Sequence, residues 1–202
     1  MIYLAIKAVV FDFGGVLVRT EDSSGRVKWE KRLGLNPGEL SKVVFDSDAS
    51  VQASVGKLPF TAVWEHVAQT FSLSPAEADQ LCTDFFSGDR MDAVLVEFLK
   101  SLRPRYKTAI LSNAMSDARN LFSQTYHLDP VVDCYIISAE EKMVKPDPAF
   151  YRLACDRLGV QPEEMVFVDD FIQNVDGALA VGIKAYQFKS TPDLLSELKL
   201  VL

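Results

Sequence analysis

The chain has 202 residues, of which 49% are hydrophobic and 24% are charged, and its formal net charge is −7. This length and balance suit one large domain, or a core with a smaller insertion, and allow a substantial buried core. The negative charge argues against nonspecific binding to nucleic acid or to an anionic membrane. The apolar stretches are too short to span a bilayer, so we expect no membrane association.

The N-terminal stretch MIYLAIKAVVFD has neither a basic region nor a small-residue cleavage site, so we expect no secretory signal. The three cysteines, Cys82, Cys134 and Cys155, are widely spaced and odd in number. This usage is typical of reduced thiols rather than of a disulfide framework or a zinc site. We therefore expect a cytoplasmic protein. The sequence does not indicate an oligomeric state.

The first predicted element is a short apolar strand at residues 6–11. Four similar strands are predicted at 106–111, 132–138, 164–169 and 183–188. From the second strand onward, helical patterns follow, at 116–127, 147–159, 172–182 and 191–202. Apolar strands that alternate with helices indicate a parallel sheet covered on both faces. Right-handed crossovers then give an α/β fold with a Rossmann-like, doubly wound core.

Almost all of the chain between the first two strands reads as helix, with patterns at 24–34, 36–47, 58–71, 74–86 and 91–103. The start at Ser74 is the clearest, because Pro75 follows it and Glu77 lies three residues on. Open parallel sheets bind ligands at the carboxyl ends of their strands, so an insertion at that end would cover the site. We predict a helical cap at 18–88 and a core formed by 1–17 and 89–202.

Polar residues stand at or shortly after the ends of four predicted strands: Asp12, Ser112 with Asn113, Lys145, and Asp169 with Asp170. In a parallel sheet these groups share one edge. Carboxylates gathered there raise each other's pKa unless a cation is present. Mg²⁺ suits such a site, since it takes one or two carboxylates together with water and phosphate oxygens. Asp12 is then placed to attack phosphorus, while Ser112 and Lys145 hold the phosphoryl oxygens.

Each of these residues also has an ordinary structural interpretation. An aspartate at a strand end often forms a turn. Ser112 with Asn113 could cap the next helix, and the acidic pair could complement a helix dipole. The occurrence of all four groups in order is what favours a site over these interpretations.

Four motifs resemble those of the haloacid dehalogenase-like (HAD) hydrolase superfamily, in the subgroup with a helical cap after the first strand. They are VVFDFGGVLV, AILSNA, VKPDPAFY and VFVDDFIQNVDGALAVGI, in the family's order. The resemblance implies a Mg²⁺ cofactor and, most often, a phosphatase of small phosphorylated metabolites. It implies that Asp12, the Gly14 carbonyl and Asp170 bind the metal. It also implies that Asp169 assists in that site, through water or by orienting Lys145, and that Asn113 helps to hold the phosphoryl group.

Gly14 departs from the common family pattern, which has a second aspartate two residues after the nucleophile. That residue acts as general acid and base, which is typically worth about 10²–10⁴ in rate. In the first interpretation the protein is still a phosphatase, acting on acyl phosphates, aryl phosphates or sugar 1-phosphates with good leaving groups. Some epoxide-hydrolase-like and sugar-phosphate phosphatase members resemble this chain in having glycine there.

Two other interpretations remain open. The chain could be a metal-free 2-haloacid dehalogenase, although the acidic pair would repel a carboxylate substrate. It could also be a catalytically weak binding or scaffold module, although binding alone needs neither the acids nor Lys145. Arg19, Glu21 and Asp22 follow the nucleophile loop, and an acid there could replace the missing one. Further candidates are Lys57, for substrate selection, and Asn174, as support for the loop after the fourth strand.

Overall fold

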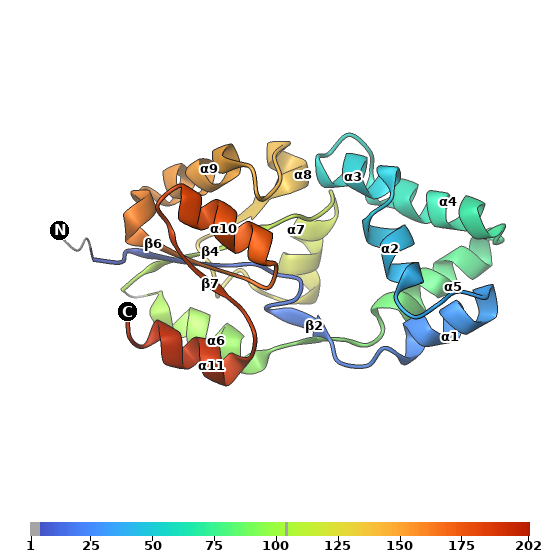
Figure 1. Cartoon of the computed structure of the whole chain (residues 1–202), viewed down its shortest axis with the longest axis horizontal. Helices are drawn as coiled ribbons and strands as arrows, with labels where there is room; N and C mark the ends of the chain where they lie inside the picture. The colour runs from blue at the N-terminus through green and yellow to red at the C-terminus, as the bar shows by residue number, and fades with distance from the viewer. Residues whose placement is uncertain (1–4, 104) are drawn as a thin grey trace.

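The computed structural model describes residues 5–103 and 105–202. A layer of sheet and helices forms one side of the molecule, and a group of helices without a sheet forms the other (Figure 1). Within the described ranges, no helix combines the length and the apolar character that crossing a membrane requires.

The main sheet has five parallel strands in the order β5-β4-β1-β6-β7. They are β1 (Ala8–Phe11), β4 (Lys107–Ser112), β5 (Cys134–Ile137), β6 (Met165–Asp169) and β7 (Lys184–Gln187). These are the five strands that the apolar runs predict, and β1 lies between β4 and β6. The predicted α/β fold with a Rossmann-like core is confirmed.

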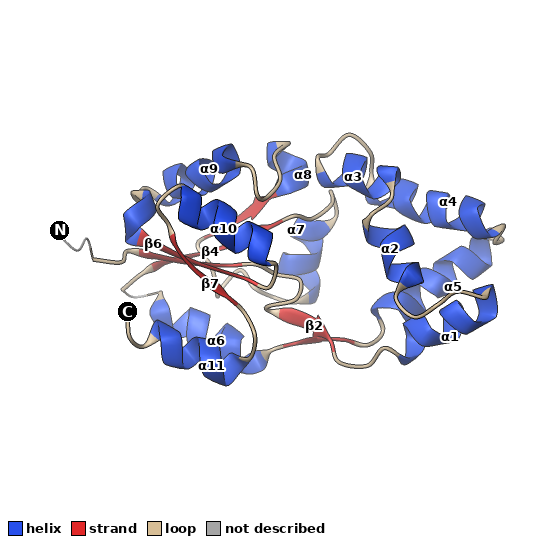
Figure 2. Cartoon of the chain, viewed as in Figure 1, coloured by secondary structure: helices blue, strands red, loops and turns tan. Residues whose placement is uncertain are grey.

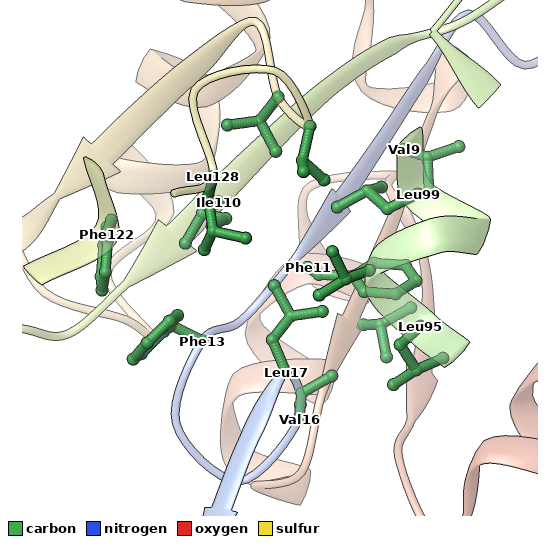
Figure 3. Packing of buried hydrophobic residues seen from close by; sticks show 14 of the residues in the cluster. Val9, Phe11, Phe13, Val16, Leu17, Leu95, Leu99, Ile110, Phe122 and Leu128 are labelled. Atoms are coloured by element: carbon green, nitrogen blue, oxygen red, sulfur yellow. The ribbon is translucent and has the colours of Figure 1, made fainter. Parts of the chain in front are cut away.

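Side chains of β1 alternate between two apolar clusters, because successive residues of a strand point to opposite faces. Val9 and Phe11 belong to one cluster (Figure 3), and Ala8 and Val10 belong to the other. The first face is covered by α6 (Ala93–Leu102), α7 (Ala118–Asn120), a π-helix (Leu121–Thr125) and α11 (Thr191–Leu198). The second is covered by α9 (Pro148–Leu158) and α10 (Ile172–Ala180). Buried on both faces, β1 can carry a near-continuous apolar run.

The helical group between β1 and α6 has an apolar cluster of its own, which includes Trp29, Leu40 and Leu81. Its helices are α1 (Ser24–Leu33), α2 (Glu39–Phe45), α3 (Asp48–Ser54), α4 (Phe60–Phe71) and α5 (Pro75–Phe86), and Figure 2 shows them apart from the sheet. Four of the five follow predicted patterns, and α5 begins with the capping box expected at Ser74. The sequence pattern predicts no helix at α3.

A two-stranded antiparallel ribbon joins the helical group to the sheet layer. It consists of β2 (Val18–Thr20) and β3 (Asp89–Met91). Neither strand was predicted, because three residues carry too little pattern to distinguish a strand from a loop. Its strand β2 falls inside the predicted cap and its strand β3 falls inside the predicted core, so the ribbon belongs to both. The division into a cap at 18–88 and a core formed by 1–17 and 89–202 stays a prediction.

The helical group also touches the sheet layer at the loop before α4. A Cβ at Gly56 would overlap the Ala139 carbonyl, which lies in the short helix α8 (Ser138–Glu141). The Phe60 N–H lies 3.4 Å from the Ser116 hydroxyl, and Met115 packs against the cluster of the helical group. The helical group therefore lies against the loop that follows Ser112.

Candidate active site

Asp12 lies directly after β1, at the carboxyl end of the central strand. Its N–H donates to the Val168 carbonyl of β6 at 2.8 Å, and its side chain is 10% exposed. The Phe13 N–H donates to Asp12 Oδ1 at 2.7 Å. The ring of Phe13 packs against Phe122, with 4.2 Å between ring centroids (Figure 3). Asp12 is thus held at the carboxyl end of the strands, while Phe13 points into the core.

Lys145 is the cation of the site, and its side chain is fully buried. Its Nζ lies 2.9 Å from Asp12 Oδ1 and 2.6 Å from Asp169 Oδ2. Asn113 fixes the backbone of Lys145, because its Nδ2 donates to the Lys145 carbonyl at 3.0 Å and its Oδ1 accepts the Lys145 N–H at 2.8 Å. These contacts bring three predicted site residues together and show Asn113 supporting the lysine.

Asp169 is fully buried, and both of its carboxylate oxygens are engaged. Oδ1 accepts the Phe171 N–H at 2.9 Å and Asn174 Nδ2 at 3.0 Å. Oδ2 accepts Asn174 Nδ2 at 3.1 Å, in addition to Lys145 Nζ. Tyr151 in turn donates its hydroxyl to the Asn174 carbonyl at 2.7 Å. Asn174 therefore supports the acidic loop, and Tyr151 is a supporting residue that the sequence analysis missed.

Asp170 completes an acidic group. Carboxylate oxygens of Asp12, Asp169 and Asp170 all lie within 4.8 Å of one another. Oδ1 of Asp170 is buried and has no hydrogen-bond partner among the described residues. Gly15 makes this packing possible, since its φ is +78° and a Cβ there would overlap the Asp170 carboxylate. An unpaired buried carboxylate oxygen beside two more acids fits a divalent cation.

The pKa values of the acidic group also indicate a site for a cation. The pKa of Asp12 is raised to about 7, because burial, the largest cause, and the charge of Asp169 together outweigh the lowering by the Lys145 ammonium. Burial, followed by the charge of Asp169, also raises the pKa of Asp170. One ammonium therefore does not compensate three carboxylates, and an added cation would favour their ionised forms.

Gly14 has a different environment from Gly15. A Cβ built at Gly14 meets nothing within 4 Å, and Gly14 is not among the residues with positive φ. Its backbone pairs with Val18 in an isolated bridge. The position therefore does not need glycine for conformation or for packing. Ser112, the last residue of β4, is buried at the same edge of the sheet, and its contact with a phosphoryl group stays a prediction.

Other predicted candidates lie outside this group. Arg19 donates to the Val16 carbonyl and pairs with Asp92. Asp22 accepts the Ser24 N–H at the start of α1, and Glu21 is exposed. Lys57 is exposed in the loop between α3 and α4. No contact with the acidic group is found for these side chains in the described part of the chain.

A family model described as haloacid dehalogenase-like hydrolase matches residues 6–182. An (S)-2-haloacid dehalogenase of Burkholderia cepacia is 40% identical over 90 residues, which is 45% of this chain and 38% of that protein. A phosphatase of Mycobacterium tuberculosis is 29% identical over 198 residues, covering 91% of this chain and 87% of that protein.

Among solved structures, a HAD family enzyme of Bacteroides thetaiotaomicron, in complex with magnesium and inorganic phosphate, has a TM-score of 0.77 at 22% identity. The match covers 93% of this chain and 96% of that chain. This similarity establishes a common fold. For three curated relatives, the Burkholderia cepacia enzyme among them, this chain spans only between 19% and 39% of the relative's own length.

Proposed function

The chain belongs to the haloacid dehalogenase-like hydrolase family, and from this premise we propose that it is a Mg²⁺-dependent phosphatase of small phosphorylated metabolites. One observation carries the proposal: carboxylate oxygens of Asp12, Asp169 and Asp170 lie within 4.8 Å of one another, Lys145 pairs with the first two, and one oxygen of Asp170 is left unpaired. Phosphoryl transfer needs a nucleophile and positive charge near the phosphoryl oxygens, and this donor set offers the first and can recruit the second.

Asp12, the Gly14 carbonyl and Asp170 would hold the cation. When bound, Mg²⁺ supplies charge that offsets the carboxylates and the phosphoryl oxygens. Asp169 has no oxygen free of hydrogen bonds from the protein. We therefore assign Asp169 to the orientation of Lys145, within the acidic group but without direct contact to the metal.

Asp12 is the proposed nucleophile. Its contacts with Phe13 and Lys145 both use Oδ1, so Oδ2 accepts neither of these hydrogen bonds. A bond forms between a carboxylate oxygen of Asp12 and phosphorus, and the bond from phosphorus to the leaving oxygen breaks. Water then attacks the phosphorus of the aspartyl-phosphate, which releases inorganic phosphate and restores Asp12. Lys145 and Ser112 hold phosphoryl oxygens in both steps.

Gly14 defines the preferred substrates within this proposal. Since no carboxylate stands there to protonate the leaving group, we expect acyl phosphates, aryl phosphates and sugar 1-phosphates to react faster than simple alkyl phosphates. The helical group would exclude water from the site while it lies against the loop after Ser112.

Phosphate release from a panel of such substrates tests the proposal, with Mg²⁺ or with EDTA. We expect release that requires Mg²⁺ and is lost in Asp12→Asn, because the amide cannot act as the nucleophile. Asp176→Asn, which changes an exposed acid of α10, is the matched control and should leave the rate unchanged. Equal release from Asp12→Asn would contradict the assigned nucleophile.

A 2-haloacid dehalogenase is the second candidate, favoured by the 40% identity to the Burkholderia cepacia enzyme over 90 residues. In that reaction Asp12 would displace halide from carbon, and Asp169 and Asp170 would repel the carboxylate of the substrate. Chloride release from 2-chloropropionate distinguishes the two candidates. Chloride release without Mg²⁺, together with no phosphate release, would favour the dehalogenase.

A further inference from the structure

Arg19 connects the β2–β3 ribbon to the loop that carries the nucleophile. One guanidinium nitrogen donates to the Val16 carbonyl at 2.7 Å, and the other lies 2.7 Å from Asp92 Oδ2. The guanidinium also lies over the ring of Phe188, 5.1 Å from its centroid. A planar group with donors in a fixed fork can make all of these contacts at once, and a lysine ammonium cannot.

Asp92 is well placed to hold Arg19. Its side chain is 8% exposed, and it also accepts the Leu95 N–H at 3.0 Å and the Thr191 hydroxyl at 2.5 Å. Burial raises the pKa of Asp92, but these hydrogen bonds and Arg19 outweigh it and keep the pKa below its ordinary value. Asp92 thereby joins Arg19 to the first turns of α6 and α11.

The loop between Asp12 and β2 is short and internally bonded. The Val18 N–H donates to the Phe13 carbonyl at 2.9 Å, and the Gly15 N–H donates to the Val18 carbonyl at 2.9 Å. The Leu17 carbonyl accepts the Asp92 N–H at 2.8 Å, and the Val16 carbonyl is the one that Arg19 holds. The position of this loop decides where Gly14 lies and how Asp12 is held, because the Phe13 N–H donates to Asp12 Oδ1.

A second arginine makes the same kind of contacts with α5 and β3. Arg26 in α1 donates to the Phe85 carbonyl at 3.0 Å and to Asp89 at 3.3 Å, and it lies 4.1 Å from the centroid of the Phe85 ring. Arg26 binds the ribbon to the helical group. Arg19 differs from Arg26 in its carbonyl partner, because Val16 belongs to the nucleophile loop and Phe85 belongs to α5.

We propose that Arg19 is a positioning residue for the reaction: held by Asp92 and Phe188, it fixes residues 13–17 against the core so that Asp12 and Gly14 keep their geometry. This inference rests on the proposed function for its kinetic consequence. Its structural consequence, the ordering of the loop, does not depend on which substrate is hydrolysed.

The test compares Arg19→Lys with Arg26→Lys in the full chain, using p-nitrophenyl phosphate with saturating Mg²⁺ and amide hydrogen exchange by mass spectrometry. In Arg19→Lys we expect kcat to fall about 10- to 100-fold while KM changes less than about twofold, because a displaced reacting group costs rate rather than binding. Exchange should quicken in peptides covering residues 13–18 and stay unchanged in peptides from α4. Arg26→Lys should keep kcat and the protection of residues 13–18.

Equal losses of kcat in both variants, or faster exchange throughout the chain, would overturn the proposal and leave Arg19 as a stabilising residue only. If the parent protein releases no phosphate from any substrate, the proposed function fails by itself. The exchange comparison then decides the positioning role: unchanged protection of residues 13–18 in Arg19→Lys would refute it.

Discussion

Gly14 and Gly15 are adjacent and have opposite requirements. Gly15 has a φ of +78°, and its missing side chain leaves the space that the Asp170 carboxylate fills. Gly14 has neither constraint, since a Cβ there meets nothing within 4 Å. The absence of a carboxylate at Gly14 is therefore a chemical property of this chain, and the fold does not impose it.

Gly14→Asp should consequently fold and gain a general acid. We expect kcat/KM for simple alkyl phosphates to rise, up to the factor of about 10²–10⁴ that such catalysis typically supplies. Aryl phosphates should gain less, because their leaving groups need less protonation. The measurement is the ratio of kcat/KM for the two substrate classes in parent and variant.

Gly15→Asp is the matched control, with the same side chain one residue on. It should lose activity and stability, because an L-residue is strained at that φ and its Cβ would overlap Asp170. A Gly14→Asp variant that is as impaired as Gly15→Asp would contradict the open space inferred at Gly14.

At the scale of elements, the start of α5 shows how a local motif acquires a tertiary partner. Ser74 donates its N–H at 2.9 Å and its hydroxyl at 2.7 Å to Glu77 Oε2, and Arg32 of α1 pairs with Oε1 of the same carboxylate. The two Ser74 hydrogen bonds and then Arg32 lower the pKa of Glu77 to about 2. The capping box was predictable from the sequence, and the contact with α1 was not.

Because the folded-state pKa of Glu77 lies below its ordinary value of 4.5, its stabilising contribution is complete above about pH 4.5 and is lost as the pH falls toward about 2. Glu77→Gln should therefore lower the melting temperature at neutral pH. This difference from the parent protein should shrink through that window. Melting curves from circular dichroism between pH 7 and pH 3 provide the measurement, and a difference that stays constant with pH would argue against the ionised capping box.

On the scale of the whole molecule, the site depends on strand order. Asp12 follows β1 and Asp169 ends β6, and these strands are neighbours although the two aspartates are 157 positions apart in the chain. Repulsion among the clustered acids is the cost of that arrangement, and a bound cation would offset it. Cation binding and the stability of the whole fold should consequently be coupled.

Mg²⁺ at about 100 times its dissociation constant should stabilise the folded protein by about 2.7 kcal/mol, which corresponds to a rise of about 5–10 °C in melting temperature. Asp170→Asn should reduce this shift strongly, whereas Asp176→Asn should keep it. Scanning calorimetry at increasing Mg²⁺ concentrations, in the absence of substrate, measures this shift in melting temperature. A parent protein whose melting temperature does not respond to Mg²⁺ would contradict the proposed metal site.

The sequence by itself determined the five strands, four of the helices inserted between β1 and α6, and the order of polar groups at the strand ends. Each of these rests on a local signal, such as an apolar run, a helical period or a capping residue. The meeting of Asp12, Lys145 and Asp169 followed from the parallel order, because strand ends share an edge.

Only the tertiary structure decided the β2–β3 ribbon, the hydrogen bonds that occupy Asp169 and the contacts of Arg19. These depend on pairs of residues far apart in the chain, such as Arg19 with Asp92 and Tyr151 with Asn174. A three-residue strand has no period to detect, and an arginine has the same local pattern on a solvated surface as in a buried ion pair. Their partners, and hence their roles, exist only once the chain has folded.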